Sequence, residues 1–234
     1  MYSFIIYASG SMCSSNNKNR VFLNSGTPVQ CLKHDTNAFC HSEYHGGNNW
    51  RINGTIENMI CTLKNDITPY PQQKLNSAVS MLQNILQKDL PLILREESGK
   101  MLRVCVIPRA KCEDHYSNNQ KLFRQTIQSV IRQLNCNNLI DGTHDIIRHT
   151  DTRTTHLNRS GNGGNGEMPY CGITIDTCNI SNQVEGKNIL LIDDLYTKSI
   201  CIDEDAIQAL YDKGANHVIF YSIGYTIRRN NVIL

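Results

Sequence analysis

The C-terminal part of the chain alternates short apolar runs with amphipathic segments, and this alternation limits the folds that it can adopt. The predicted strands lie at 102–107, 145–148, 188–192 and 218–223, and the predicted helices at 118–134 and 203–213. Almost fully apolar strands separated by amphipathic helices are typical of a parallel sheet that is covered on both faces. We therefore expect an α/β fold with a mainly parallel sheet over residues 101–234.

The first hundred residues follow a different pattern. A short strand-like run at 3–7 is followed by a long polar stretch rich in Asn, Ser, Gly and His. Apolar residues at helical spacing then predict a helix over 74–87, and Pro91 lies just beyond its expected end. We interpret residues 1–100 as an N-terminal lobe, a hood or interaction region, that precedes the α/β domain.

The overall charge names no class of partner. A formal net charge of +2 over 234 residues argues neither for a strongly basic nucleic-acid binder nor for a polybasic membrane patch, although it leaves room for local patches. The ten cysteines are scattered singly, and we interpret them as reduced thiols. No apolar run approaches the ~18 residues of a membrane helix. These features predict a soluble, cytoplasmic protein without membrane contact.

One apolar strand ends on two adjacent acids, Asp193 and Asp194. Ligands of open parallel sheets bind beyond the carboxyl ends of the strands, so this is a favoured position for a site. Adjacent carboxylates repel each other and are costly to bury unless hydroxyls, a cation or hydrogen-bond donors satisfy them. The alternative is structural, with one acid capping a helix and the other in solvent.

The stretch "LLIDDLYTKSICIDEDAIQALYDKGANHVIFYSIGYT" resembles the phosphoribosyl-pyrophosphate (PRPP) motif of the type I phosphoribosyltransferases. The resemblance covers about residues 101–226 and is nearest to the amidophosphoribosyltransferase-like and competence-factor-like branch. It implies the type I phosphoribosyltransferase fold. It also implies that Asp193 and Asp194 hold the 2′- and 3′-hydroxyls of the ribose.

The resemblance further implies contacts to both phosphate groups of PRPP. The turn that would wrap the 5′-phosphate contains Tyr196, Thr197, Lys198, Ser199, Ile200 and Cys201. In "VIPRAK", Arg109 and Lys111 would face the leaving diphosphate, although ordinary surface charge is the alternative. The implied metal is Mg²⁺, chelated mainly by the diphosphate and water rather than by protein ligands.

Two departures from the family pattern fall in the phosphate turn. Ser199 stands where the family has glycine, and Cys201 stands where it has a hydroxyl residue. Lys198 adds a cation, and Thr197 and Ser199 keep hydroxyls that can donate to phosphate oxygens. We interpret the site as altered rather than dead.

A long break between predicted strands runs from Thr150 to Gln183 and includes the glycine-rich "NRSGNGGNGEMP". Type I enzymes carry a flexible loop over the reacting centre in this interval, which makes the segment a candidate lid. Arg153, His156 and Arg159 would then contact the diphosphate or the incoming base, with Arg153 and His156 as candidate catalytic residues. A surface insertion without a role is the alternative.

The stretch "CLKHDTNAFCHSEYH" gathers zinc-ligand types within the N-terminal lobe: Cys31, His34, Cys40, His41 and His45. Some competence-factor-like relatives carry an N-terminal zinc ribbon, but the paired Cys-x-x-Cys knuckles are missing here. We favour polar loop histidines over a zinc site.

Three functions fit these observations. The first is a PRPP-dependent transferase, a magnesium-using glycosyltransferase of nucleotide metabolism that transfers phosphoribose to a nitrogen nucleophile and releases pyrophosphate. The second is a non-catalytic module that senses PRPP or a nucleotide. The third is a specialised effector, in phage defence or as a toxin, acting on a nucleotide or nucleic-acid base. The resemblance also implies a homodimer, and the N-terminal lobe is a candidate surface for a protein partner.

Overall fold

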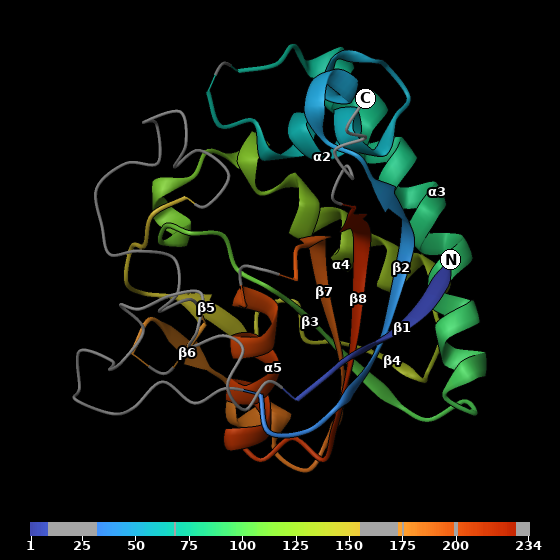
Figure 1. The fold of residues 1–234 in the computed structure, drawn as a ribbon, viewed down its shortest axis with the longest axis vertical. Coiled ribbons are helices and arrows are strands. Elements are labelled where there is room, and N and C mark those ends of the chain that lie inside the picture. Colours follow the sequence, from blue (N-terminus) through green and yellow to red (C-terminus); the bar gives the residue numbers. More distant parts are fainter. Residues whose placement is uncertain (9–31, 68, 155–172, 175, 199–200, 228–234) are drawn as a thin grey trace, which may run out of the picture.

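The protein is a mixed α/β structure built on a mostly parallel six-stranded sheet (Figure 1). The computed structural model describes residues 1–8, 32–67, 69–154, 173–174, 176–198 and 201–227. The strands of the sheet are β1 (Tyr2–Ile6), β2 (Thr36–Tyr44), β3 (Leu102–Val106), β4 (Leu139–Asp141), β7 (Asn188–Tyr196) and β8 (His217–Thr226). They lie in the order β1-β2-β8-β7-β3-β4, and β1 alone among them is antiparallel to its neighbour.

Helices cover both faces of this sheet (Figure 1). One apolar core joins the sheet to α2 (Ile56–Lys64), α3 (Gln72–Glu96) and α4 (Leu122–Leu134). The other joins it to α5 (Ile202–Asp212) and to a small hairpin of β5 (Ile146–Arg148) and β6 (Cys178–Ile180). Short 3₁₀ turns complete the fold: η1 (Gly47–Arg51), η2 (Glu113–His115), η3 (Asn118–Gln120) and η6 (Asn182–Val184).

The predicted parallel pairing around β7 is confirmed. β7 pairs in parallel with β3 on one side and with β8 on the other. Alternate residues of β7 enter different cores, since Leu190 and Ile192 face α2, α3 and α4 while Ile189 and Leu191 face α5. A strand that is buried on both faces must be apolar throughout, which explains the uninterrupted run in the sequence.

The prediction of a sheet strand at 145–148 is corrected by the structure. Residues 146–148 do form a strand, β5, but among the described residues it pairs with β6 in a separate antiparallel hairpin. The place beside β3 belongs to β4, three residues that include the polar Asp141. So short a strand has no detectable periodicity, whereas Ile146 of β5 is buried in the same apolar core as α5.

Helix α3 is longer than predicted, because it continues through Pro91 to Glu96. Proline removes one helical hydrogen bond and usually ends or kinks a helix. Here Pro91 lies on the exposed side, while Leu90 and Ile93 on the opposite side are fully buried. Continued burial of the apolar side offsets the lost hydrogen bond.

Residues that precede Met101 contribute directly to the same sheet and core. β2 lies between β1 and β8, in parallel register with β8 from Ala38 to Tyr44. Helix α2 begins after Thr55, whose side chain accepts a hydrogen bond from the backbone N–H of Asn58.

Within the described residues, no helix combines the length and apolar character needed to cross a bilayer.

A buried polar network ties α3 to the sheet. Asp89 is 3% exposed and accepts hydrogen bonds from Tyr221 Oη at 2.8 Å and from His41 Nδ1 at 2.9 Å. Burial alone would raise the pKa of Asp89, but the hydrogen bonds from His41 and Tyr221 hold it below its ordinary value. The carboxylate therefore stabilises the fold in its charged form.

Replacing Asp89 with Leu should destabilise the protein, because Tyr221 Oη would be left buried without its acceptor. We expect a loss of about 1–3 kcal/mol in urea unfolding at pH 7. A carboxyl with a lowered pKa contributes above its unfolded value of about 3.9 and loses this contribution as the pH falls. The difference from wild type should therefore shrink at pH 3; a difference that is equal at both pH values would contradict this account.

Candidate functional site

A cleft of about 200 Å³ lies at the carboxyl ends of β3 and β7. The chain leaves β3 through α4 toward β4 and leaves β7 through α5 toward β8, so the connections diverge to opposite faces here. Such a switch point is the usual ligand position in open α/β sheets. Residues that line the cleft include Lys64, Arg109, Tyr116, Arg148, Thr152, Arg153, Thr154, Asp193, Asp194, Thr197 and Asp203.

Both acids predicted from the strand end lie in this cleft. β7 continues past them to Tyr196, so the acids belong to the last residues of the strand rather than to a loop. The side chain of Asp193 accepts a hydrogen bond from the backbone N–H of Asp194 at 2.7 Å. Asp194 pairs with Lys64 at the end of α2, with 2.8 Å between Oδ2 and Nζ.

Lys64 supplies the cation that two adjacent carboxyls require. Burial alone would lower the pKa of Lys64, but Asp194 and then Asp193 raise it above its ordinary value. The ammonium therefore stays charged beside the acids. Sequence reasoning missed this residue for two reasons. A lysine in the last turn of a helix is common, and nothing nearby in the sequence pointed to Asp194.

A third acid, Asp203, faces Asp193 from the first turn of α5. Asp203 is 4% exposed, and its Oδ1 has no hydrogen-bond partner among the described residues. Burial and then the charge of Asp194 raise the pKa of Asp193 to about 7. Burial and then Asp193 raise the pKa of Asp203 well above its ordinary value, a shift that favours a shared proton between the two carboxyls.

Arg109 lies on the cleft wall, and its guanidinium is engaged by the protein. Nη1 donates to the backbone oxygens of Lys64 at 2.7 Å and Gln120 at 2.9 Å, and Nη2 pairs with Asp66. The guanidinium also stacks on Tyr116 at 4.3 Å from the ring centre. Arg109 thus joins the end of α2 to the loop after β3, and its contact with a diphosphate stays a prediction.

Lys111, the other predicted diphosphate residue, lines a smaller adjoining hollow together with Tyr116 and Lys121. Its backbone N–H donates to Tyr116 Oη at 3.0 Å. Arg153 lies on the wall of the main cleft, as a role near the reacting centre would require. His156 and Arg159 lie outside the described residues.

Arg148 is a buried cation of the cleft that sequence reasoning missed. It ends β5, is 5% exposed, and donates from Nε to the backbone oxygen of Arg109 at 2.6 Å. Its Nη1 has no hydrogen-bond partner among the described residues. An Arg–Asp pair between Arg103 and Asp145 fixes the hairpin beside β3 and so positions Arg148. A charged residue that ends an apolar strand was the available signal, the same signal that identified Asp193.

The turn after β7 is only partly positioned as the resemblance implied. Thr197 lines the cleft, with its Oγ1 2.7 Å from Thr226 Oγ1, while Lys198 is exposed. Tyr196 points away from the cleft, is buried among aromatic rings, and donates to Glu204 at 2.9 Å. Ser199 and Ile200 lie outside the described residues.

The prediction that Cys201 is a reduced thiol is wrong, because Cys201 takes part in a disulfide bond. It also adopts a left-handed conformation, with φ of 61°, at the N-cap of α5. The other cysteines of the described residues are free: Cys40, Cys61, Cys105, Cys112, Cys136 and Cys178. A disulfide removes the Cys201 sulfur as a hydrogen-bond donor to phosphate.

The four described N-terminal residues that sequence reasoning considered for zinc have separate partners. Cys40 is buried in β2, and His41 is bound to Asp89. The ring of His34 packs edge-on against Tyr211, and His45 lies 3.4 Å from Glu43. Cys31 lies outside the described residues. His41 therefore lies in a strand, β2, whereas the sequence analysis expected a loop histidine.

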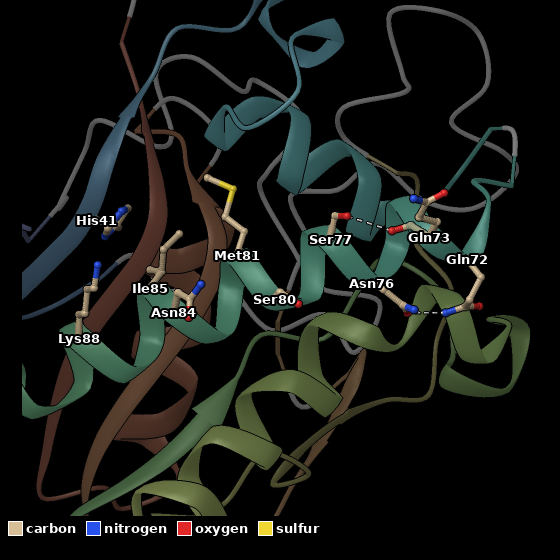
Figure 2. A pocket seen from close by; sticks show the side chains of 10 residues that line it. All are labelled: His41, Gln72, Gln73, Asn76, Ser77, Ser80, Met81, Asn84, Ile85 and Lys88. Carbon is tan, nitrogen blue, oxygen red and sulfur yellow. Dashed lines mark hydrogen bonds between the residues drawn. The ribbon is translucent and has the colours of Figure 1, made fainter.

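A larger hollow of about 870 Å³ runs along the outer side of α3 (Figure 2). Amide and hydroxyl side chains line most of it, with Lys88 and His41 at one end. Several of them bond to each other along the helix, as Gln72 does with Asn76 at 2.8 Å. Without an acid pair or a strand end, this hollow offers less chemistry than the cleft.

Comparison with known proteins adds no relative: no family model matches the chain, and no curated protein matches it.

Replacing Asp203 with Asn should stabilise the protein at alkaline pH. A carboxyl whose pKa is raised on folding destabilises the folded protein progressively as the pH rises from the unfolded pKa of the group, about 3.9, through its folded pKa. Asparagine can still donate to Asp193 but does not titrate. We expect the free energy of unfolding to rise by at least about 1 kcal/mol at pH 8, the energy of less than one pKa unit, with a smaller gain at pH 5.

Asp212→Asn, at the exposed opposite end of α5, is the matched control and should show no gain that grows with pH. A gain of equal size for Asp203→Asn at pH 5 and pH 8 would mean that Asp203 is not protonated in the folded protein.

Proposed function

We propose that the cleft binds PRPP with Mg²⁺ and that the chain is a phosphoribosyltransferase, which transfers phosphoribose to a nitrogen nucleophile and releases pyrophosphate. The observation that carries the proposal is the meeting of opposite charges in one cleft. The acid pair Asp193–Asp194 is suited to ribose hydroxyls, and the buried Arg148 is suited to an anion. PRPP presents both kinds of group.

Each part of the ligand has a chemical counterpart in the proposed complex. Carboxylates accept charge-assisted hydrogen bonds from the 2′- and 3′-hydroxyls. The 5′-phosphate lies toward Thr197 and the N-terminus of α5, the end of a helix that favours an anion. The diphosphate lies toward Arg148 and Arg153, because a guanidinium can hold phosphate oxygens through two parallel hydrogen bonds.

The chemistry asks the protein mainly to hold the leaving group and to position the sugar. The acceptor nitrogen forms a bond to C1 as the C1–O bond breaks, and the electron pair leaves with the diphosphate. Arg148, already desolvated, stabilises the charge that develops on this leaving group. The hard carboxylate oxygens of Asp193 and Asp194 fit a nearby Mg²⁺, which when bound neutralises part of the diphosphate charge.

A sensing module that binds PRPP without turnover is the second candidate. Both acids already have partners within the chain, Lys64 for Asp194 and Asp203 for Asp193. The disulfide at Cys201 also removes one predicted phosphate donor. These features favour a ligand that binds in competition with internal contacts, as in a sensor.

Replacing Asp193 and Asp194 together with Asn should weaken PRPP binding by at least about tenfold in calorimetry with Mg²⁺. Each charge-assisted hydrogen bond contributes roughly 1.5–3 kcal/mol, and tenfold needs only about 1.4 kcal/mol. Asp212→Asn is the matched control, since it removes an acid from the far end of α5. Unchanged affinity in the double variant would exclude the proposed ribose contact.

Replacing Arg148 with Met should weaken binding of inorganic pyrophosphate by at least about tenfold, because a buried guanidinium is replaced by an apolar side chain of similar length. Arg132→Met removes an exposed cation from α4 and should leave the affinity unchanged. Thermal unfolding of both variants checks that they fold. Equal affinity of wild type and Arg148→Met would remove Arg148 from the proposed diphosphate site.

Release of pyrophosphate from PRPP, measured across a panel of bases and amines, separates the two candidates. Release that depends on one acceptor supports the transferase. Binding without release for any acceptor supports the sensor. Absence of both binding and release would overturn the proposed function.

A further inference from the structure

A group of potential metal ligands lies outside the cleft, in the loop that follows β3. Cys112, Asp114 and His115 each offer one ligand atom, and these atoms all lie within 4.8 Å of one another. It is the one such group of three or more found among the described residues. Its three ligands lie within the four consecutive positions 112–115 around η2, so the local turn itself brings them together.

The geometry is close to that of a bound zinc ion. Zinc–ligand bonds of 2.0–2.3 Å place the ligand atoms of a tetrahedral site about 3.5 Å apart. The side chains of Asp114 and His115 are exposed, at 82% and 55%, and can rotate by the remaining distance. Glu113, between the ligands, is turned away and pairs with Arg124 at 3.2 Å, which anchors the turn to α4.

Asp151 contacts the imidazole at Nδ1 and also interacts with the Cys112 thiol. Its two carboxylate oxygens lie 3.2 and 3.1 Å from His115 Nδ1, and Oδ1 also accepts from the backbone N–H of Cys112 at 2.7 Å. A carboxylate at Nδ1 places the ring hydrogen there and leaves the lone pair on Nε2, the atom that faces Asp114 at 3.9 Å. Zinc-binding histidines are usually oriented by a carboxylate in this manner.

The three ligand types select the kind of ion. A thiolate, an imidazole and a carboxylate together suit Zn²⁺ or Co²⁺, whereas Mg²⁺ takes oxygen ligands. We propose that Cys112, Asp114 and His115 bind a zinc-type divalent cation, with Asp151 orienting His115 and water at the fourth position. This proposal stands apart from the function of the cleft.

A cation here would also stabilise one wall of the cleft. Asp151 directly precedes Thr152, which is buried and donates to the backbone oxygen of Ala110 from N at 2.7 Å and from Oγ1 at 3.1 Å. Thr152, Arg153 and Thr154 all line the cleft. Metal bound at His115 would therefore fix the turn after β3 against the segment that carries Arg153.

Cobalt provides a direct test, because a Co²⁺–thiolate bond gives a charge-transfer absorption that oxygen and nitrogen ligands do not. Titration of the full chain with Co²⁺ should produce this absorption with one equivalent, and Zn²⁺ should abolish it by displacement while excess Mg²⁺ should not. The absorption should be lost in Cys112→Ser and kept in Cys136→Ser, a matched change of another free cysteine.

Histidine variants test the same site through affinity. His115→Ala should lose tight Zn²⁺ binding, measured by competition with a chromophoric chelator, and the matched His45→Ala should keep it. Asp151→Asn should weaken Zn²⁺ binding by about ten- to a hundredfold, the usual effect of losing such an orienting carboxylate. Circular dichroism verifies that each variant folds. Absence of the thiolate absorption in wild type, or its persistence in Cys112→Ser, would overturn the proposal.

Discussion

The ion pair between Lys64 and Asp194 is the interaction on which the cleft depends. It places a cation beside two adjacent carboxyls and a third, Asp203, in a partly enclosed space where unpaired acids would be costly. Lys64 is held in place because Arg109 bonds to its backbone oxygen and to that of Gln120. The end of α2, the loop after β3 and η3 are thus joined at one point. Arg109 supports the site whether or not it touches a ligand.

Much of the sheet could be predicted because the residue pattern of each central strand reflects its burial. The runs 189–192 of β7 and 218–221 of β8 are buried on both faces and are therefore continuously apolar, and the helices beside them carry one apolar side each. Where local signals are weak, prediction failed. β4 has three residues, one of them Asp141, and α3 passes Pro91 because buried side chains beyond the proline hold the helix in place. Tertiary packing decided both cases.

In the candidate site, too, the residues with a local sequence signal could be predicted and those placed by tertiary packing could not. Asp193 and Asp194 could be found because two acids end an apolar strand, a pattern visible within a few residues. Lys64 and Arg148 come from segments far away in the sequence, and only the packing of α2 and of the β5–β6 hairpin brings them to the cleft. The raised pKa of Asp203 was also beyond sequence reasoning. It follows from burial and from the facing Asp193, whereas the first turn of a helix usually favours a charged acid.

A crystal structure of the chain grown with Mg²⁺ and PRPP tests the central claim most directly, because it locates the ligand instead of inferring its position. The account predicts electron density in the cleft, with the ribose hydroxyls within hydrogen-bond distance of Asp193 and Asp194 and the diphosphate against Arg148. Density for PRPP elsewhere, for example along the outer side of α3, or an unchanged Lys64–Asp194 pair beside an empty cleft at saturating PRPP, would contradict it.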